Sequence, residues 1–493
     1  MKAGTRTLRE TVDTRLSRVS MHGVTLIALA ALAALAIVLG ACGALPFSPA
    51  AMAATLAVTV VASAGVTLVG SAIVRRRPMP ESAAITGLLL FFLVWPSTDP
   101  ATLAWYAAAA GAAAAAKYLL VFRGAHLVNP AAFGAAALAV SGKGAVSWWI
   151  GSTAMFAAVV VAGVLVTRRT GTMRFAWGVA AGAYVVTAAT LLVNGSGVAS
   201  ALSTAALSNP WVFWAVFMVT EPMTAPQRAR DRWLVGALMV LLIAVPVHFA
   251  VGSAHVATSP ELVLLVANVV TALVQRPRPQ WARVTAVERV GADGLSVVFE
   301  VPRALGIRAG QWVEVQAPRG GFDRRGARRV FTPIGTGRQF SIVTRVPADA
   351  SSFKREWARL RVGERVRVTR KGGSFLLPRD PDLPLLLVAG GVGVTPVLAF
   401  LDELGPGLGG RDVTVIYRAG AGGEIGRDAL EASGAEVHVI DGRITAPVVT
   451  KLVPDVVWRM AYVAGPPVMV GNVSRVLHKV GARAVAVDEF FGA

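Results

Sequence analysis

The sequence contains a single cysteine, Cys42, among its 493 residues. One thiol cannot form a disulfide within the chain, nor supply the thiolates that an iron–sulfur cluster or a structural zinc site requires. Histidine is also scarce, with six residues. A haem relay needs two stacked pairs of histidines as axial ligands. The apolar part contains only His126, His248 and His255, with His22 before it, and their spacing does not give such pairs. The sequence therefore predicts no metal site.

Charged residues are few, at 15% of the chain, whereas hydrophobic residues reach 55% and the mean hydropathy is +0.60. The apolar part extends to about Val274, and ordinary soluble sequence follows Gln275. This division predicts a membrane domain followed by a soluble module. The net charge of +20 divides equally between the two parts. Basic cytoplasmic loops and attraction to membrane lipid explain it without nucleic acid.

The predicted chain has five parts. They are a basic cytoplasmic N-terminal arm at 1–23, a polytopic membrane domain at 24–274, a linker at 275–283, an antiparallel β-barrel domain at 284–380 and an α/β domain at 381–493. The first apolar run lacks a cleavage site and is longer than a signal-peptide core, so we expect it to be retained as a span.

Ten apolar segments make up the predicted membrane domain. They lie near 24–42, 51–74, 83–95, 101–121, 129–141, 147–167, 174–193, 208–220, 233–250 and 256–274. Several reach the ~20 residues that a helix needs to cross a bilayer. The third, fifth and eighth are short and bounded by proline or glycine, which is typical of broken or re-entrant helices.

Arginines lie on one side of these segments. The loops that contain Arg75–Arg77, Arg123, Arg168 with Arg174, and Arg228–Arg232 share a side with the basic N-terminus, whereas the opposite loops are nearly uncharged. This bias predicts that both termini, and the soluble module, face the cytoplasm from the cell (inner) membrane.

The ten segments divide into five plus five, which makes the two halves inverted repeats. The third segment of each half ends near an acid followed by proline, at Asp99-Pro100 and at Glu221-Pro222. An acid at a broken helix is a functional candidate, but an interfacial acid at a helix end commonly has no role, so both interpretations stay open. Asn129, before Pro130, is favoured as a helix cap over a functional group.

Two motifs of the apolar part, HLVNPAAFG at 126–134 and FMVTEPMTAP at 217–226, resemble signatures of one family of membrane proteins. This family comprises a flavin-carrying membrane component of the sodium-pumping NADH:quinone reductase and its counterpart in the Rnf electron-transport complex. The resemblance implies a ten-helix, inverted-repeat, flavin-carrying protein. The Ser-Gly-Ala-Thr motif, on which the family often carries FMN, is absent. A membrane flavin, FMN or riboflavin, is therefore expected to bind non-covalently, and a quinone is the alternative.

Short alternating runs follow Val284: LSVVFEV, QWVEVQA, FSIVTRV and ERVRVTR. This pattern predicts a small antiparallel barrel. After Pro384 the strand patterns LLLVAG, VTVIYR, EVHVID and MAYVAG alternate with helices, which predicts a doubly wound domain. The fold class is thus multidomain, with an α-helical membrane domain, a β-barrel domain and an α/β domain.

The stretch from Leu383 to Pro396, LPLLLVAGGVGVTP, begins as a strand buried on both faces and continues as a glycine loop that opens a helix. Such a loop lets a phosphate approach backbone N–H groups at a helix N-terminus. A plain strand-to-helix turn explains the stretch equally well. The candidate residues are Gly390, Gly391, Gly393, Thr395 and Pro396.

Four ordered motifs across residues 281–493 resemble the ferredoxin–NADP reductase superfamily. Arg338-Gln339-Phe340-Ser341 is similar to its flavin motif, which implies that Arg338 binds the pyrophosphate, Phe340 stacks on the isoalloxazine and Ser341 lies near the redox nitrogen. The resemblance also implies a second flavin-phosphate loop, at Gly373 and Ser374.

The glycine loop GGVGVTP is similar to the nicotinamide-phosphate loop of this superfamily, and Ala464–Met469 to its Cys-Gly-Pro-Pro-x-Met segment. The resemblance implies nicotinamide contacts from Gly465, Pro466 and Met469. Glu489 and Phe490 lie where the superfamily places an acid and an aromatic ring near the flavin, although Phe490 and Phe491 are as well explained by packing. Arg418 and Arg427 are candidates for a ribose phosphate, with Glu424 between them, so NADH and NADPH stay open.

The leading hypothesis is a membrane-bound oxidoreductase that passes electrons from NAD(P)H through FAD to a flavin or quinone in the membrane domain, with ion transport as an option. Ser341, Glu489 and Phe490 are the catalytic candidates; Asn129, Asp99 and Glu221 are those of the membrane domain. The alternatives are an ion or solute transporter with a reductase module and, less favoured, a haem-relay ferric reductase or oxidase. An external iron–sulfur protein stays open as a redox partner, because the chain lacks the cysteines for a cluster.

Overall fold

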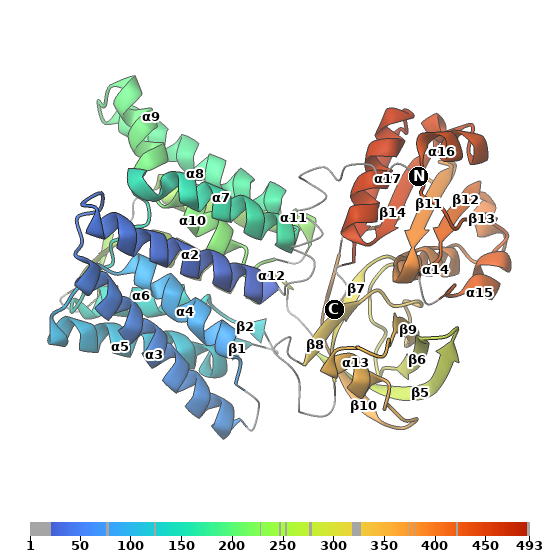
Figure 1. Ribbon diagram of the computed structural model, residues 1–493, viewed down its shortest axis with the longest axis horizontal. Helices are drawn as coiled ribbons and strands as arrows, with labels where there is room; N and C mark the ends of the chain where they lie inside the picture. The colour runs from blue at the N-terminus through green and yellow to red at the C-terminus, as the bar shows by residue number, and fades with distance from the viewer. Residues whose placement is uncertain are drawn as a thin grey trace. The chain divides into compact units, whose positions relative to one another are not determined.

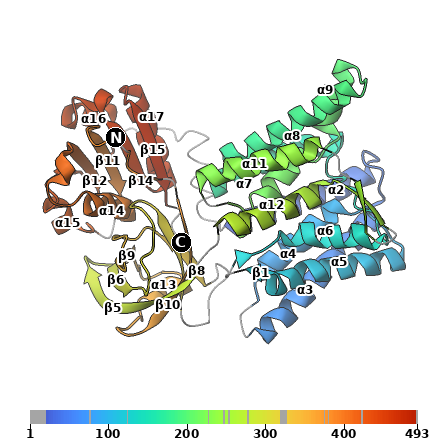
Figure 2. The ribbon, with the colours of Figure 1, turned by 180° about the vertical axis from the view of Figure 1, so that it is seen from behind.

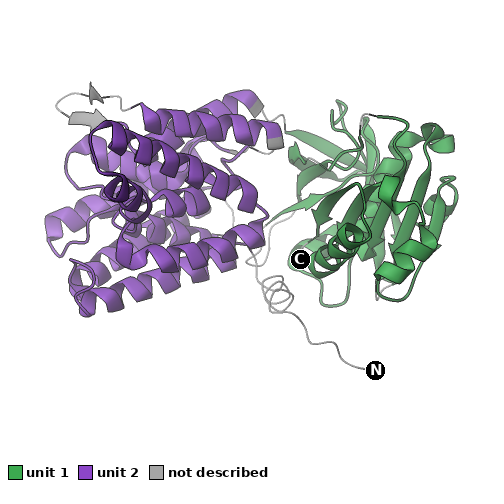
Figure 3. Cartoon of the chain, turned by 90° about the horizontal axis from the view of Figure 1, so that it is seen from above, with its two compact units in different colours: residues 1–18, 278–493 green, residues 19–277 purple. Residues whose placement is uncertain are grey.

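The fold is that of a computed structural model (Figure 1), which describes residues 21–74, 78–122, 125–226, 228–245, 248–251, 254–275, 279–317, 327–373, 375–378, 380–420 and 423–490. The chain divides into two compact units, coloured separately in Figure 3. The helical unit comprises Val19–Pro277. The sheet unit contains Arg278–Ala493.

Helices overlap all ten predicted apolar segments. They are α2 (Met21–Ala41), α3 (Pro49–Ile73), α4 (Pro80–Leu93), α5 (Pro100–Leu119), α6 (Pro130–Ser141), α7 (Thr153–Thr170), α8 (Met173–Val193), α10 (Trp211–Phe213) continued by η1 (Trp214–Val219), α11 (Ala229–Ala244) and α12 (Pro260–Gln275). Four of them, α2, α3, α7 and α8, are long and apolar enough to cross a membrane. A fifth candidate is α9 (Val198–Leu207) with 211–219, a pair bent by 42°. The count of ten spans stays a prediction.

The structure differs from the predicted segments in three places. Residues 248–251 and 254–257 form a two-stranded antiparallel hairpin, β3 and β4, so the ninth helix ends at Ala244 and the tenth begins at Pro260. Residues 147–152 are loop. The residues between the seventh and eighth segments, expected as a loop, contain α9. Hydropathy alone does not distinguish a helix from another apolar conformation, which explains these differences.

Proline begins several of these helices. Pro80, Pro100, Pro130 and Pro260 each occupy the first position of a helix, where the missing N–H costs nothing. The eighth segment ends as η1, a π-helix rather than an α-helix. π-helical turns are rare and occur frequently at functional sites.

Small residues let the helices of this unit pack closely. A Cβ at Gly87 in α4 would lie 2.6 Å from the Val60 Cα in α3, and a Cβ at Gly134 in α6 would lie 2.6 Å from the Ala109 carbonyl oxygen in α5. Such contacts are typical of helix packing in membranes, where close backbone approach replaces the hydrophobic effect. Helices α8 and α11 lie side by side in both ribbon views (Figures 1 and 2).

The sheet unit starts with a six-stranded antiparallel sheet in the order β8-β7-β10-β5-β6-β9. Its strands are β5 (Gln280–Val290), β6 (Gly294–Glu300), β7 (Trp312–Gln316), β8 (Arg328–Phe331), β9 (Gln339–Arg345) and β10 (Arg365–Gly372). Strand β5 begins at Gln280, inside the predicted linker 275–283, because Ala282 and Val284 alternate into the sheet core. Helix α13 (Ser352–Trp357) adds the buried Phe353 and Trp357 to this core.

The second half is a doubly wound α/β domain, as predicted. Its five parallel strands have the order β13-β12-β11-β14-β15, with β11 (Leu385–Gly390), β12 (Val413–Arg418), β13 (Glu436–Val439), β14 (Met460–Gly465) and β15 (Ala484–Glu489). Leu385 and Leu387 face the core under α14 (Val394–Leu404), whereas Leu386 and Val388 face the core under α16 (Ala446–Leu452) and α17 (Pro467–Lys479). The unbroken apolar run of β11 is thus explained by burial on both faces.

Candidate functional site

The direction of chain winding reverses between β11 and β14, the central pair of the parallel sheet. From β11 the chain adds β12 and β13 on one side, and then returns to add β14 and β15 on the other. Loops diverge at such a point, so ligands of doubly wound domains bind in the crevice at the carboxyl ends of these strands. The two predicted glycine segments, 390–393 and 464–469, directly follow β11 and β14.

Glycine is required in both segments because their backbones touch. A Cβ on Gly393 would lie 2.4 Å from the Ala464 carbonyl oxygen, and a Cβ on Gly390 would lie 2.0 Å from Sδ of Met469. Gly465 has φ of +154° and packs against Gly390. The two segments therefore pack in close contact, through the Ala464 backbone at Gly393 and through the Met469 side chain at Gly390.

Helix α14 starts directly at the first glycine loop. The Thr395 hydroxyl donates to the Val392 carbonyl at 3.1 Å and is 2% exposed, and Pro396 is buried beside it. Both side chains thus hold the loop in shape, and the N-terminal N–H groups of α14 are the groups that favour an anion.

Arg418 ends β12 directly beside Gly390 in the sheet register, and its side chain is exposed. Within the described part of the chain no hydrogen bond or ion pair of Arg418 occurs. Arg427 differs, because Glu424 and Glu431 accept from it at 3.0 and 2.6 Å. Of the two predicted ribose-phosphate candidates, Arg418 is the one whose guanidinium has no hydrogen-bond or ion-pair partner among the described residues, and it lies at the carboxyl end of the sheet beside Gly390.

The end of the chain closes the other side of the crevice. Glu489 is paired with Gly465 across β14 and β15, and the Phe490 N–H donates to the Gly465 carbonyl at 2.9 Å. The Phe490 ring packs against the core cluster under α14, in agreement with the packing interpretation. The predicted Phe491 lies outside the described residues. Burial, with Glu489 as the neighbouring charge, raises the pKa of Asp488 to about 6.

Ser341 faces the same core region from the antiparallel sheet. It exchanges backbone hydrogen bonds with Ile334, and Val343, two residues further on the same face of β9, is a member of the cluster under α14. Arg345, at the end of β9, donates to the Gly423 carbonyl and pairs with Asp293 at 3.0 Å. The sheet and the loop after β12 are thereby connected, a connection that no sequence motif indicated.

Phe340 points the opposite way. It is 2% exposed and stacks on Phe299 inside the sheet core, with ring centroids 5.4 Å apart. In this structure its ring fills the core, so the predicted stacking on a flavin stays a prediction. Arg338 is exposed and donates to the Glu300 carboxylate at 3.4 Å, which holds it at the strand edge.

Gly373 follows β10 with φ of +109°, and the Gln311 amide donates to its carbonyl at 3.0 Å. Ser374 lies outside the described residues. On the strand before this loop, Arg370 is buried and the Lys371 ammonium donates to the carbonyls of residues 305 and 306.

In the helical unit, Asn129 caps α6 and also forms hydrogen bonds to two other helices. Its side-chain oxygen accepts from the Ala132 N–H at 3.0 Å, and its amide donates to the Met218 carbonyl of η1 at 3.3 Å. Its own N–H donates to the Asn268 side chain of α12 at 2.7 Å. Asn129 is 1% exposed, so it connects three helices at their packed centre.

The two acid-proline ends differ. Asp99 caps α5, accepting from the Thr102 N–H and hydroxyl at 2.8 and 2.7 Å, which agrees with the structural interpretation. Glu221 follows the π-helix and faces His126, whose Nδ1 lies 3.7 Å from its carboxylate, and it also accepts from Thr224 at 3.0 Å. Glu221 thus belongs to a small polar cluster.

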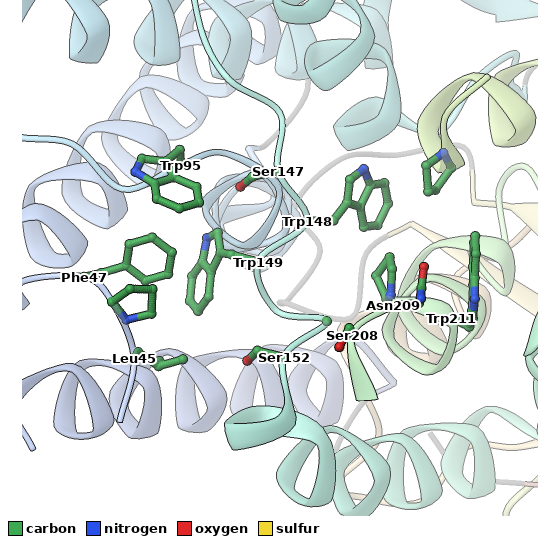
Figure 4. Close-up of a pocket in the computed structure, with 14 residues that line it drawn as sticks. Leu45, Phe47, Trp95, Ser147, Trp148, Trp149, Ser152, Ser208, Asn209 and Trp211 are labelled. Carbon is green, nitrogen blue, oxygen red and sulfur yellow. The ribbon is translucent and has the colours of Figure 1, made fainter. Parts of the chain in front are cut away.

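A cavity of about 440 Å³ lies at the other end of α6 from Asn129 (Figure 4). Aromatic rings dominate its lining, with serines and prolines between them; the lining residues are Leu45, Pro46, Phe47, Trp95, Ser147, Trp148, Trp149, Gly151, Ser152, Ser208, Asn209, Pro210, Trp211 and Pro260. Phe47 lies edge-on to Trp95 and Trp149, with centroids 4.7 and 5.4 Å apart. We name this cavity the tryptophan pocket.

Polar atoms of the tryptophan pocket lack partners. The Trp211 Nε1–H and the Ser147 and Ser152 hydroxyls are buried without a hydrogen bond within the described residues, and such groups are costly unless something binds them. Trp148 instead donates to the buried Glu261 carboxylate at 2.8 Å. The sequence signal for this site is the pair Trp148-Trp149 in a loop.

No family model matches the chain. Methane monooxygenase component C of Methylosinus trichosporium is 26% identical to it over 142 residues, which are 28% of this chain and 41% of that protein. The chain thus spans about two fifths of the length of the curated relative that it matches.

Two solved structures are also similar. The FAD/NAD-binding domain of a nitric oxide dioxygenase from Vibrio cholerae is 18% identical, with 43% of this chain and 98% of that chain covered and a TM-score of 0.37. Flavohemoglobin from Malassezia yamatoensis is 18% identical, with 65% and 97% covered and a TM-score of 0.40. The match to the monooxygenase component supports an oxidoreductase. The resemblance of the membrane domain stays a prediction.

We expect Gly393→Ala to destabilise the sheet unit by about 1–3 kcal/mol, because the added methyl overlaps the Ala464 backbone and overpacking of this kind costs that much. The matched control is Gly471→Ala in α17, where a Cβ meets nothing within 4 Å and alanine favours the helix. Thermal unfolding of both full-length variants measures the difference. Equal melting temperatures would show that the two loops are not in contact.

We expect Asp488→Asn to change the pH dependence of stability. Because the folded pKa, about 6, lies above the usual aspartate value of 3.8, the native protein is most stable below pH 4 with respect to this group and loses that contribution as the pH rises through 6. The advantage of the asparagine variant should therefore grow between pH 4 and pH 6 and then stay constant. A flat difference from pH 4 to pH 7, in denaturant unfolding, would contradict this.

Proposed function

We propose that the chain is a membrane-bound NAD(P)H oxidoreductase that carries FAD in its sheet unit and delivers electrons to an acceptor in its helical unit. The single observation that carries the proposal is the glycine crevice at the reversal point of the α/β sheet, with Arg418 and the chain end at its rim. A cytoplasmic dinucleotide is the ligand that this geometry fits best.

The residues present suit both cofactors. The crevice offers backbone N–H groups at the start of α14 for a phosphate, and Gly465, Pro466 and Met469 form the wall that a nicotinamide would contact. Ser341 and Phe490 approach the same core region from β9 and from the chain end, so they would orient a flavin edge there. The chemistry that the cofactors supply is hydride transfer and onward release of electrons. The predicted closure of the antiparallel sheet into an FAD-binding barrel is part of this proposal.

The membrane location is supported by the four helices of spanning length and by the one-sided arginines. In the proposed topology ten segments form an inverted repeat in the inner membrane, with both termini in the cytoplasm. Asn129, Glu221 and His126 then lie at the cytoplasmic ends of their segments. If ion movement is coupled to electron transfer, Glu221 is the residue that we expect to carry the ion. His126 beside Glu221 supports a role of this carboxylate in binding a proton or a cation.

The acceptor that we propose for the helical unit is a non-covalently held flavin or a quinone. The tryptophan pocket supports it, because flat rings stack on indoles and the unpartnered donors at Trp211, Ser147 and Ser152 match carbonyl oxygens on such a ring. The pocket lies at the uncharged loops, opposite the cytoplasmic candidates Asn129 and Glu221. Electrons would therefore cross most of the helical unit to reach the tryptophan pocket. A second redox group within the helical unit would divide this path into shorter steps, and an external iron–sulfur protein is the alternative electron acceptor.

We expect Arg338→Ala to weaken FAD binding, because each hydrogen bond to a charged group contributes about 1.5–3 kcal/mol. The exposed Arg303→Ala serves as the control, since Arg303 lies outside the flavin motif. Titration of the flavin-depleted full-length protein with FAD measures the affinity. Unchanged FAD affinity in the Arg338 variant would remove this residue from the site.

We expect reporter fusions after Pro279 to read as cytoplasmic and those after Leu45 as extracytoplasmic, because the positive loops determine the orientation. Each fusion serves as the control for the other, since the two positions lie on opposite sides of the membrane in the proposed topology. An extracytoplasmic signal at Pro279 would separate the sheet unit from cytoplasmic NAD(P)H and would refute the arrangement.

We expect Trp211→Phe to weaken acceptor binding about three- to tenfold, since it removes one hydrogen-bond donor but keeps a ring. Reduction of a membrane quinone by full-length protein in liposomes should fall, while reduction of ferricyanide by the sheet unit stays unchanged. Trp105→Phe, in an exposed part of α5, is the matched control. Equal quinone reduction in all three proteins would exclude the tryptophan pocket from the electron path.

A further inference from the structure

An arginine-rich surface covers the outer face of the antiparallel sheet where β5 pairs with β10. Arg283 and Arg365 lie directly opposite each other in the strand register, and Arg367 lies opposite Trp281. Between them, Ala282 and Val366 are fully buried on the inner face. The alternation therefore projects all four outer side chains to one side. Together with Val362 in the adjoining turn, we name Trp281, Arg283, Val362, Arg365 and Arg367 the arginine–tryptophan surface.

The arginines of this surface have no polar partner among the described residues. The three arginines of the surface have no hydrogen bond or ion pair in the part of the chain that the structure describes. The neighbouring acid, Glu300, is paired with Arg283 in the register, but it accepts from Arg338 at 3.4 Å. Like charges directly opposite on adjacent strands destabilise a sheet, so an external anion would stabilise the Arg283–Arg365 pair.

Exposed apolar side chains are interleaved with these charges. Trp281 is 54% exposed and Val362 is 63% exposed. The turn that carries Val362 is fixed next to β5, because the Gly363 N–H donates to the Val284 carbonyl at 2.9 Å. An indole and an aliphatic side chain among guanidinium groups is the composition of a membrane–water interface: guanidiniums bind phosphates, and tryptophan lies at the headgroup level.

The position of the arginine–tryptophan surface in the chain also indicates a membrane as its partner. Trp281 follows Gln275, the last residue of α12, by six residues. Six residues of fully extended chain reach no more than ~22 Å, so only a short stretch of chain separates this surface from the end of that helix. If α12 ends at the cytoplasmic face of the membrane, as the proposed function holds, the bilayer is the nearest anionic surface.

We propose that the arginine–tryptophan surface docks on anionic phospholipid headgroups and so fixes how the sheet unit is oriented at the membrane. The inference rests on the membrane location in the proposed function. Lipid phosphates satisfy Arg283, Arg365 and Arg367, while Trp281 and Val362 enter the headgroup layer. An acidic redox protein is the other anionic partner of this chemistry, and it is the outcome that would contradict the proposal.

The test uses the full-length chain with Cys42→Ala and Val362→Cys, labelled with a fluorophore at residue 362 and reconstituted in phosphatidylcholine vesicles with or without phosphatidylglycerol. Lipids with a nitroxide on the headgroup quench the label on contact. We expect strong quenching only with phosphatidylglycerol, and its loss in high salt, because salt screens surface charges.

A triple variant, Arg283→Gln, Arg365→Gln and Arg367→Gln, should lower the ratio of docked to undocked protein about a hundredfold, from the contribution of each arginine near an anionic surface. The matched control neutralises Arg303, Arg443 and Arg483, three exposed arginines elsewhere in the sheet unit. Ferricyanide reduction should be equal in all variants, which confirms that they fold.

Two results would overturn the proposal. One is quenching that is equal in both vesicle types or unaffected by the triple variant. The other is a triple variant that keeps its lipid contact and instead loses electron transfer to an acidic iron–sulfur protein. Failure of the full-length chain to float with either vesicle type would contradict the membrane location itself, and flotation separates that result from the other two.

Discussion

The contact between the backbones of the two glycine loops is the constraint on which the sheet unit depends. Gly393 lies against the Ala464 carbonyl, and Gly390 against Met469, so neither position has room for a side chain. This contact aligns β11 with β14 and forms the crevice between them. It also explains why the chain end can reach the site: β15 pairs with β14, and the Phe490 N–H binds Gly465.

Much of this arrangement could be predicted from the sequence because its signals are local. The unbroken apolar run of β11 and the glycines after it indicate a strand and a turn irrespective of their surroundings. The direction of Phe340 could not be predicted in this way, because it depends on which face of β9 meets Phe299. The strands at 248–251 and 254–257 could not be predicted for a related reason, since short apolar runs of this kind suit a helix as well as a strand. The tryptophan pocket is assembled from loops far apart in the chain, so it required the three-dimensional structure.

The helical unit buries polar groups along its helices, as at Thr55, Thr59 and Ser63 of α3, and also at points where helices end. Asn129 satisfies the start of α6 and reaches both η1 and α12. Glu261 is buried but accepts from the Trp148 indole. Unpaired polar groups are expensive in an apolar surrounding, and these two are paired. The donors of Trp211, Ser147 and Ser152 in the tryptophan pocket differ from them, because the described residues offer these donors no hydrogen-bond partner.

The π-helical end of the eighth segment has a geometric consequence for the residues beyond it. A π-turn contains about one residue more than an α-turn, and one residue corresponds to about 100° around a helix axis. Winding the same residues of 214–219 as an α-helix, with none removed, would rotate the residues beyond them by about 100°. This rotation would turn Glu221 away from His126 and shift the Met218 carbonyl relative to the Asn129 amide. The extra residue therefore acts as a local register offset, and the polar cluster at the end of the segment exists only in that register.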